Sequence, residues 1–370
     1  MASLTSIDLE ALLAPISDDM PAGKDCRQNA TSNSLYFQVK TARNSARETE
    51  RKNAIGADLG SPDDDWRKVF DLAPKILTQE SKDLEVACWY LEALLRRHGF
   101  RGLRDGFKLL DGLIDRFWED LYPTPDEDGL ETKVAPITGL NGTGQEGVLI
   151  SAIRTSLITQ GNSVGPFAFW ECQKALANQR IQDSDNREKE FKKLGFEFED
   201  IEKAIHESSV EFVTDLRDDL IECIALYRQI SGRLDEYCGT YDAPPTSLVI
   251  SLLEECLSVV KHLGQHKFPV MEVVTPGDNT IATDAGASSA ASPAPTRAGG
   301  PPETREQAFK QLLEIAEFFR KREPHSPISY VLEKAVKWGN MPLSELMREL
   351  ISDDKTLEEY GKLTGVKTEE

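Results

Sequence analysis

Apolar residues recur at intervals of three and four along most of this chain, the spacing that places side chains on one face of an α-helix. The clearest example begins at Ser61-Pro62-Asp63-Asp64, where an N-cap residue and a proline precede acids in the first turn. The apolar stripe that follows consists of Trp66, Val69, Phe70, Ala73, Ile76 and Leu77. We therefore expect a helix that packs this face against a core.

Two further helices are predicted directly after this one. The second spans about 81–98, with Ser81 as its N-cap, and Gly99 ends it after a basic last turn. The third runs over about 103–120 and cannot continue through Pro123. Because the connections are short, neighbouring helices should be antiparallel. Helical patterns also occur near 147–157 and 167–177.

A longer apolar seam lies between residues 208 and 237, with spacings that average close to 3.5 residues. A second helix restarts at Pro244-Pro245-Thr246, so the two predict a helical hairpin. The hairpin either packs within the protomer, which we favour, or serves self-association. The seam residues are Val210, Val213, Leu216, Leu220, Ile224, Tyr227, Ile230, Leu234 and Tyr237.

Residues 274–302 differ from the rest because Pro, Gly, Ala, Ser and Thr make up most of them. Such a segment cannot bury enough apolar area to offset its ordering entropy, so it is predicted to be a flexible linker. The chain is therefore expected to be all-α with four parts: an N-terminal helical domain (1–160), a middle helical-hairpin domain (161–272), the linker (273–303) and a small helical C-terminal domain (304–370).

The C-terminal domain contains three predicted helices, which begin near Thr304, Ser326 and Pro342. A fragment of this length has a limited capacity to form a core. Its helices are apolar around much of their circumference, which favours a partner outside the protomer. We therefore predict that this domain oligomerises. The candidate interface residues are Phe309, Phe318, Phe319, His325, Tyr330 and Trp338.

Charge and composition exclude several classes of protein. The 43 basic and 63 acidic residues give a net charge of −20, which disfavours nucleic acid and anionic membrane surfaces as partners. No apolar run is long enough to insert in a membrane, and no signal peptide is visible at the N-terminus. The six cysteines lack a C-x-x-C pair and are expected to be buried free thiols in a reducing cytosol.

One glycine cluster, Gly142–Gly147, matches G-x-G-x-x-G, the pattern of dinucleotide-binding turns. That chemistry needs a strand before the turn, which the sequence does not predict, and Glu146 would repel a phosphate. A connector between two helices is the preferred interpretation. A nucleotide-binding helical regulator stays open as a minor alternative.

Metal binding and catalysis receive no convincing support from the sequence. His262 and His266 stand four residues apart, but Gly264 lies between them and Cys256 is in poor register for a third ligand. No nucleophile–base pattern occurs among the histidines. We therefore expect no enzyme activity, no cofactor and no metal.

Several segments taken in order resemble the TssA family of bacterial type VI secretion proteins, with an ImpA-type N-terminal domain. The C-terminal block resembles the C-terminal oligomerisation domain of the same family. The matching segments are Leu13–Ser17, Ala22–Asp25, Asp65–Val69, Ser81–Arg96, His98–Leu103, Phe117–Pro123 and Phe318–Gly339.

The resemblance implies a cytoplasmic, non-enzymatic assembly protein. Members of the family form ring-shaped homo-oligomers, of the decamer or dodecamer class, through the C-terminal region. They contact baseplate, tube, spike or sheath components of the secretion machine. This chain lacks the long central extension of the longest members, so the resemblance favours a baseplate-associated scaffold. A helical adaptor that binds one partner without forming a ring is the alternative.

Overall fold

The computed structural model of the chain describes residues 3–28, 31–57, 59–127, 129–181, 183–268, 305–322, 328–341 and 345–346. The chain divides into two compact units, Met1–Thr275 and Pro276–Glu370. Within the described ranges the regular elements are helices, accompanied by isolated β-bridges rather than strands. The expected all-α class is confirmed.

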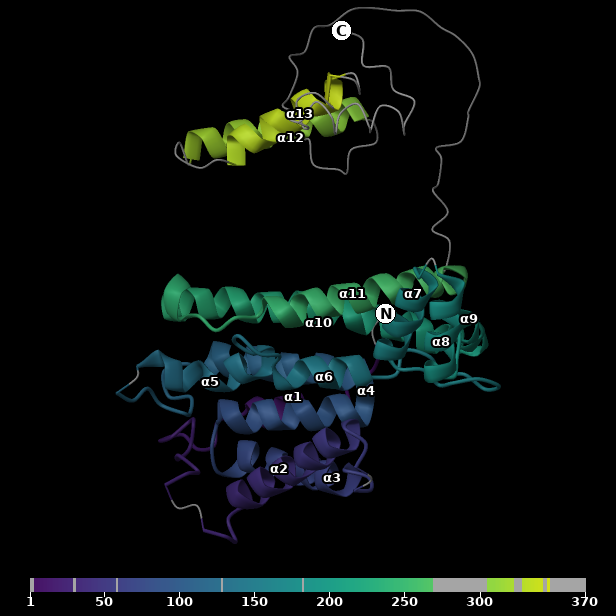
Figure 1. Ribbon diagram of the computed structural model, residues 1–370. Helices are drawn as coiled ribbons and strands as arrows, with labels where there is room; N and C mark the ends of the chain where they lie inside the picture. The colour runs from purple at the N-terminus through teal and green to yellow at the C-terminus, as the bar shows by residue number, and fades with distance from the viewer. Residues whose placement is uncertain are drawn as a thin grey trace, which may run out of the picture. The chain divides into compact units, whose positions relative to one another are not determined.

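The first unit contains eleven α-helices and a 3₁₀ turn within its described residues (Figure 1). Their bounds are α1 (Leu9–Leu13), α2 (Leu35–Ala54), α3 (Asp63–Gln79), α4 (Leu84–Phe117), α5 (Leu130–Asn141), α6 (Val148–Thr155), α7 (Phe169–Gln179), α8 (Ser184–Leu194), α9 (Phe198–Glu207), α10 (Val210–Asp242), α11 (Ser247–Leu263) and η1 (Gln265–Lys267).

The predicted start of α3 agrees with the structure to within one residue, whereas the predicted cap of α4 is wrong. The Ser61 hydroxyl accepts the Asp63 amide at 3.2 Å. For α4 the N-cap is Asp83, whose carboxylate accepts the Val86 amide at 3.0 Å. Ser81 cannot serve because it lies in the preceding turn, where its own amide donates to the carbonyl of α3 residue Ile76.

The predicted break at Gly99 is present as a kink inside α4. Gly99 has φ 60° and ψ −145°, a conformation that residues with a Cβ adopt only with strain. The two predicted helices therefore form one element with a bend. The second half of α4 ends at Phe117, three residues before the predicted end, because the chain turns there.

Helix α4 is the centre of the first unit, with α2 and α3 on one side and α10 and α11 on the other (Figure 1). Seven of the nine seam residues of α10 are buried, and only Val210 and Tyr237 are exposed. Aromatic pairs link α10 to α4 and the turn after it: Tyr227 stacks on Phe107 at 4.6 Å, and Tyr237 on Trp118 at 4.9 Å. The hairpin of α10 and α11 therefore packs within the protomer, as expected.

The second unit contains a hairpin of α12 (Arg305–Arg322) and α13 (Ile328–Asn340). Arg305 donates to the Gly339 carbonyl and Arg320 pairs with Glu333, so the two helices are antiparallel. The predicted linker at 273–303 and almost all of the predicted third helix lie outside the described residues.

Two further sequence predictions concern the whole chain. None of the helices in the described ranges is long and apolar enough to cross a bilayer. All six cysteines are free thiols, as predicted, and five of them are buried. The domain boundary predicted at residue 160 stays a prediction. Helix α4 precedes this position in the sequence and α10 follows it, and the two helices share one buried core.

Candidate functional site

The structure places the predicted interface residue Phe309 inside the hairpin of the second unit. A Cβ added at Gly339 would lie 2.4 Å from the Phe309 ring, so the ring of α12 packs directly on the glycine of α13. The Arg305 guanidinium covers the ring at 5.2 Å from its centroid. Phe309 therefore helps to hold α12 against α13, whatever else it contacts.

The other predicted interface residues fall into three groups. Trp338 is half-buried, with the Lys334 ammonium 4.7 Å from its ring centroid and its indole nitrogen buried without a hydrogen-bond partner. Tyr330 is 63% exposed. The side chains of Phe318 and Phe319, and the whole of His325, lie outside the described part of the structure.

Three further exposed apolar residues in the hairpin were not among the predicted interface residues. Leu313 and Ile315 on α12 are 45% and 46% exposed, and Val331 on α13 is 62% exposed. The sequence contains a signal for such residues. Two adjacent apolar residues, such as Tyr330 and Val331, are about 100° apart around a helix, so one narrow buried face cannot include both. Together with Tyr330, these exposed apolar residues lie on more than one side of the hairpin, and we call them the hairpin surface.

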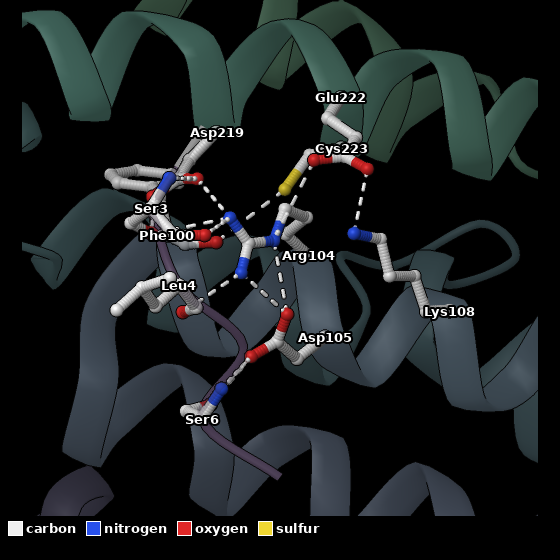
Figure 2. Close-up of polar contacts among 10 residues, drawn as sticks. All are labelled: Ser3, Leu4, Ser6, Phe100, Arg104, Asp105, Lys108, Asp219, Glu222 and Cys223. Carbon is white, nitrogen blue, oxygen red and sulfur yellow. Dashed lines mark hydrogen bonds and ion pairs between the residues drawn. The ribbon is translucent and has the colours of Figure 1, made fainter. Parts of the chain in front are cut away.

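A buried polar network in the first unit centres on Arg104 of α4, which is 1% exposed (Figure 2). Its guanidinium lies 2.7 Å from Asp105 Oδ1 and 2.6 Å from Asp219 Oδ1 on α10. It also donates to the carbonyl oxygens of Ser3 and Leu4, at 2.6 and 3.2 Å. The network therefore connects the N-terminal segment, α4 and α10.

The two carboxylates of this network have further partners of their own. Asp105 Oδ2 accepts the amide and hydroxyl of Ser6, and Asp219 accepts those of Ser3. Burial raises the pKa of Asp219, against the opposing effect of Ser3 and Arg104. Burial disfavours the charged form of Arg104, but the acids outweigh it and raise the pKa of its guanidinium. The network is a fully paired structural contact and offers no free acid or base for catalysis.

The glycine cluster forms the turn between α5 and α6, as predicted. Gly142 caps the end of α5 at φ 88°, and Gly147 is the N-cap of α6. A Cβ at Gly142 would lie 2.0 Å from the Gln145 carbonyl oxygen. Glu146 pairs with Arg154 at 2.7 Å. Steric closure of the turn explains the glycines, and the preceding element is a helix rather than the strand that a nucleotide site requires.

Among the described residues, one group of three ligating side chains has ligand atoms close enough to share an ion: Asp25, Cys26 and Asp83. Arg27 already supplies the positive charge there, at 3.2 Å from Asp25 and 2.5 Å from Asp83. Burial and the neighbouring Asp83 raise the pKa of the Cys26 thiol well above its ordinary value. A protonated thiol beside a salt bridge is a poor metal site.

Comparison with known proteins agrees with the sequence resemblance. A family model described as ImpA, N-terminal, type VI secretion system, matches residues 13–142. The chain is 25% identical over 367 residues to the type VI secretion system component TssA1 of Pseudomonas aeruginosa, covering 98% of this chain and 100% of that protein. The resemblance to the TssA family is confirmed.

A solved structure extends this likeness to the fold of the TssA-like chain. It is the N-terminal domain, including the conserved ImpA_N region, of the TssA component from the Burkholderia cenocepacia type VI secretion system. The match has a TM-score of 0.58 and 25% sequence identity, and covers 71% of this chain and 96% of that one.

The Arg104 network joins the ImpA_N region to a helix beyond it. Arg104 and Asp105 lie within residues 13–142, whereas Asp219 lies on α10 and Ser3 precedes the matched region. A buried ion pair therefore holds the family region of the TssA-like chain against the α10–α11 hairpin. The relatives of the chain are named as components of a type VI secretion system, which agrees with a structural role for the chain.

Proposed function

We propose that this TssA-like chain is a non-enzymatic, ring-forming scaffold of a bacterial type VI secretion system. It oligomerises through residues 304–370, in the decamer or dodecamer class, and presents the first unit to baseplate, tube, spike or sheath proteins in the cytoplasm. The observation that carries the proposal is the hairpin surface, together with relatives that are named as components of this system.

The positions of the exposed residues on α12 support a ring rather than a simple pair. Leu313 and Ile315 are two residues apart, which is about 200° around a helix. Both are exposed, so α12 offers apolar side chains on nearly opposite sides. A subunit of a closed ring needs two different contact surfaces, one for each neighbour. An apolar helix exposed on two sides satisfies this requirement.

The hairpin surface is large enough to contribute substantially to assembly. An aromatic side chain buries roughly 150–250 Å², so the 63% exposed Tyr330 leaves roughly 130 Å² to cover. At about 25 cal/mol per Å², covering it would contribute at most about 3 kcal/mol per subunit. Val331, similarly exposed, adds to this. Many copies held in one ring would then convert weak contacts of the first unit into avid ones.

The test is the native mass of the full-length protein at micromolar concentration. The unmodified protein should give a single ring-sized species, and a Tyr330→Glu/Val331→Glu variant should give smaller species. Ile55→Glu is the matched control, because Ile55 is an apolar residue of the first unit that is similarly exposed, and this variant should keep the mass of the ring. A monomeric unmodified protein, or an intact ring in the double variant, would contradict the proposal.

The same measurement separates the scaffold from a ring-free adaptor. An adaptor would need an apolar helix face that is open to its partner, and the seam of α10 is the candidate face. Seven of its nine residues are covered within the protomer, and only Val210 and Tyr237 stay exposed. The seam therefore gives little surface to a partner helix. The closed turn at Gly142–Gly147 gives equally little support to a nucleotide-binding regulator.

A further inference from the structure

The end of α9 and the turn after α11 bring two histidines from distant parts of the sequence into contact. His206 Nδ1 lies 3.3 Å from His266 Nε2, and the ring centroids are 5.0 Å apart. Both rings are exposed. In the sequence, His262 is the only histidine close to His266. The fold adds His206 from α9 and so forms a histidine pair that the sequence alone does not predict.

Two more potential ligands line the same hollow. Glu202 precedes His206 by four residues on α9, and His262 precedes His266 by four residues. On α9 this spacing places Glu202 and His206 on the same side of the helix. His262 is in the last turn of α11, whereas His266 lies beyond Gly264 in η1, so the helical spacing does not apply to these two. Glu202 and His262 are both exposed, so their side chains can change rotamer without disturbing the core. Four ligating side chains, two from α9, one from the end of α11 and one from η1, thus line one hollow.

The distance between the two imidazole nitrogens is suited to a tetrahedral metal ion. Zinc binds histidine nitrogen at about 2.0–2.1 Å, so two ligands at the tetrahedral angle are about 3.3–3.4 Å apart. The observed separation is 3.3 Å. Among the described residues, no third ligating atom lies close enough to share an ion with this pair, so a third ligand requires rotation of an exposed side chain.

Lys267 follows His266 directly and carries a cation close to the pair. Its ammonium donates to the His206 backbone carbonyl at 2.7 Å and so links η1 to the end of α9 beside the two rings.

We propose that His206 and His266 form a binding site for a divalent transition metal of the zinc type, with His262 or Glu202 as a further ligand. A bound ion would tie the C-terminal end of α9 to the turn that follows α11. The competing explanation is a simple hydrogen bond between two neutral imidazoles, which would need no ion.

The test is titration of the untagged, metal-free full-length protein with zinc chloride by calorimetry. We expect one site per chain, with affinity weakened at least tenfold by His206→Ala and by His266→Ala. His98→Ala is the control, because His98 lies elsewhere, against Phe70, and should leave the affinity unchanged. Loss of affinity in His262→Ala or Glu202→Gln would identify the additional ligand.

A second measurement excludes misfolding and unspecific binding as explanations. Cobalt(II) in place of zinc should give the absorption bands of tetrahedral coordination in the unmodified protein and not in the His206→Ala/His266→Ala variant. Circular dichroism should show the same helix content in both, because the two side chains are exposed. Equal zinc affinity in the double variant, or no binding by the unmodified protein, would overturn the proposal.

Discussion

Replacement of Arg104 by methionine should destabilise the first unit strongly. Methionine fills much of the same volume but cannot donate to the five oxygens that the guanidinium hydrogen-bonds on Asp105, Asp219, Ser3 and Leu4, and it cannot pair with Glu222. Two buried carboxylates would then lose their counter-ion. Removing one partner of a buried ion pair costs about 3–5 kcal/mol, because the remaining charge is left uncompensated.

The surroundings of the two acids place the expected loss near the lower end of that range. Asp105 keeps two hydrogen bonds from Ser6, and Asp219 keeps two from Ser3. We therefore expect a loss of about 3 kcal/mol in the free energy of unfolding. For a unit of this size, that corresponds to a fall of roughly 6–12 °C in melting temperature.

The assay is thermal unfolding followed by circular dichroism, with Arg67→Met as the control. Arg67 also pairs with an aspartate, Asp64 at 3.2 Å, but both side chains are largely exposed. Exposed pairs contribute about 0–1 kcal/mol, so this variant should melt close to the unmodified protein. Adding Asp219→Leu to Arg104→Met should recover part of the loss, since one of the two uncompensated charges is removed.

Equal melting temperatures for the Arg104→Met and Arg67→Met variants would refute this reasoning. That result would mean that water reaches Asp105 and Asp219 easily, or that their serine partners suffice. A double variant with Asp219→Leu that is less stable than Arg104→Met alone would equally contradict the argument, because the loss would then come from packing rather than from charge.

Two further predictions concern pH. The Lys82 ammonium donates to the Leu12 and Leu77 carbonyls, but burial lowers its pKa from 10.5 to about 8. The unfolded chain therefore keeps this proton to a higher pH than the folded chain does. Urea unfolding should therefore show stability rising between pH 8 and 10.5 relative to Lys82→Met. Hydrogen bonds from the Ser163 hydroxyl and from backbone amides lower the pKa of Glu207 to about 2. Its stabilising effect, present above pH 4.5, should disappear towards pH 2, and Glu207→Gln should lack this acid dependence in hydrogen exchange of the Ser163 loop.

Several helices of the first unit could be predicted from the sequence because their signals are local, whereas α1, α2, α8 and α9 were not predicted. A proline and acids mark the start of α3, and Gly99 marks the kink of α4. The apolar seam of α10 also correctly predicted which face of that helix is buried. The cap of α4 was misplaced because Ser81 and Asp83 are both good N-cap residues two positions apart, and only the backbone turn decides between them.

The Arg104 network and the histidine pair could not be predicted, because each depends on residues far apart in the sequence. Asp219 lies 115 residues from Arg104. A weak signal existed, since Arg104 and Asp105 stand between the core residues Leu103 and Phe107. A charged pair flanked by buried positions indicates a buried ion pair but does not name its third member.

The Arg104 network of the first unit and the hairpin surface of the second unit differ in physical character, so their variants should affect different properties of the protein. A buried ion network as a whole contributes little net stability, but removing one member leaves its partners uncompensated, so the network fixes how α4 meets α10. The hairpin surface has the opposite character, because apolar contact is strong and non-directional.

Arg104→Met should therefore lower the melting temperature without changing the native mass at temperatures below the transition. Tyr330→Glu/Val331→Glu should reduce the mass and leave the unfolding of the first unit unchanged. If either variant altered both properties, folding and assembly would be coupled, and the separation of tasks between the units would be wrong.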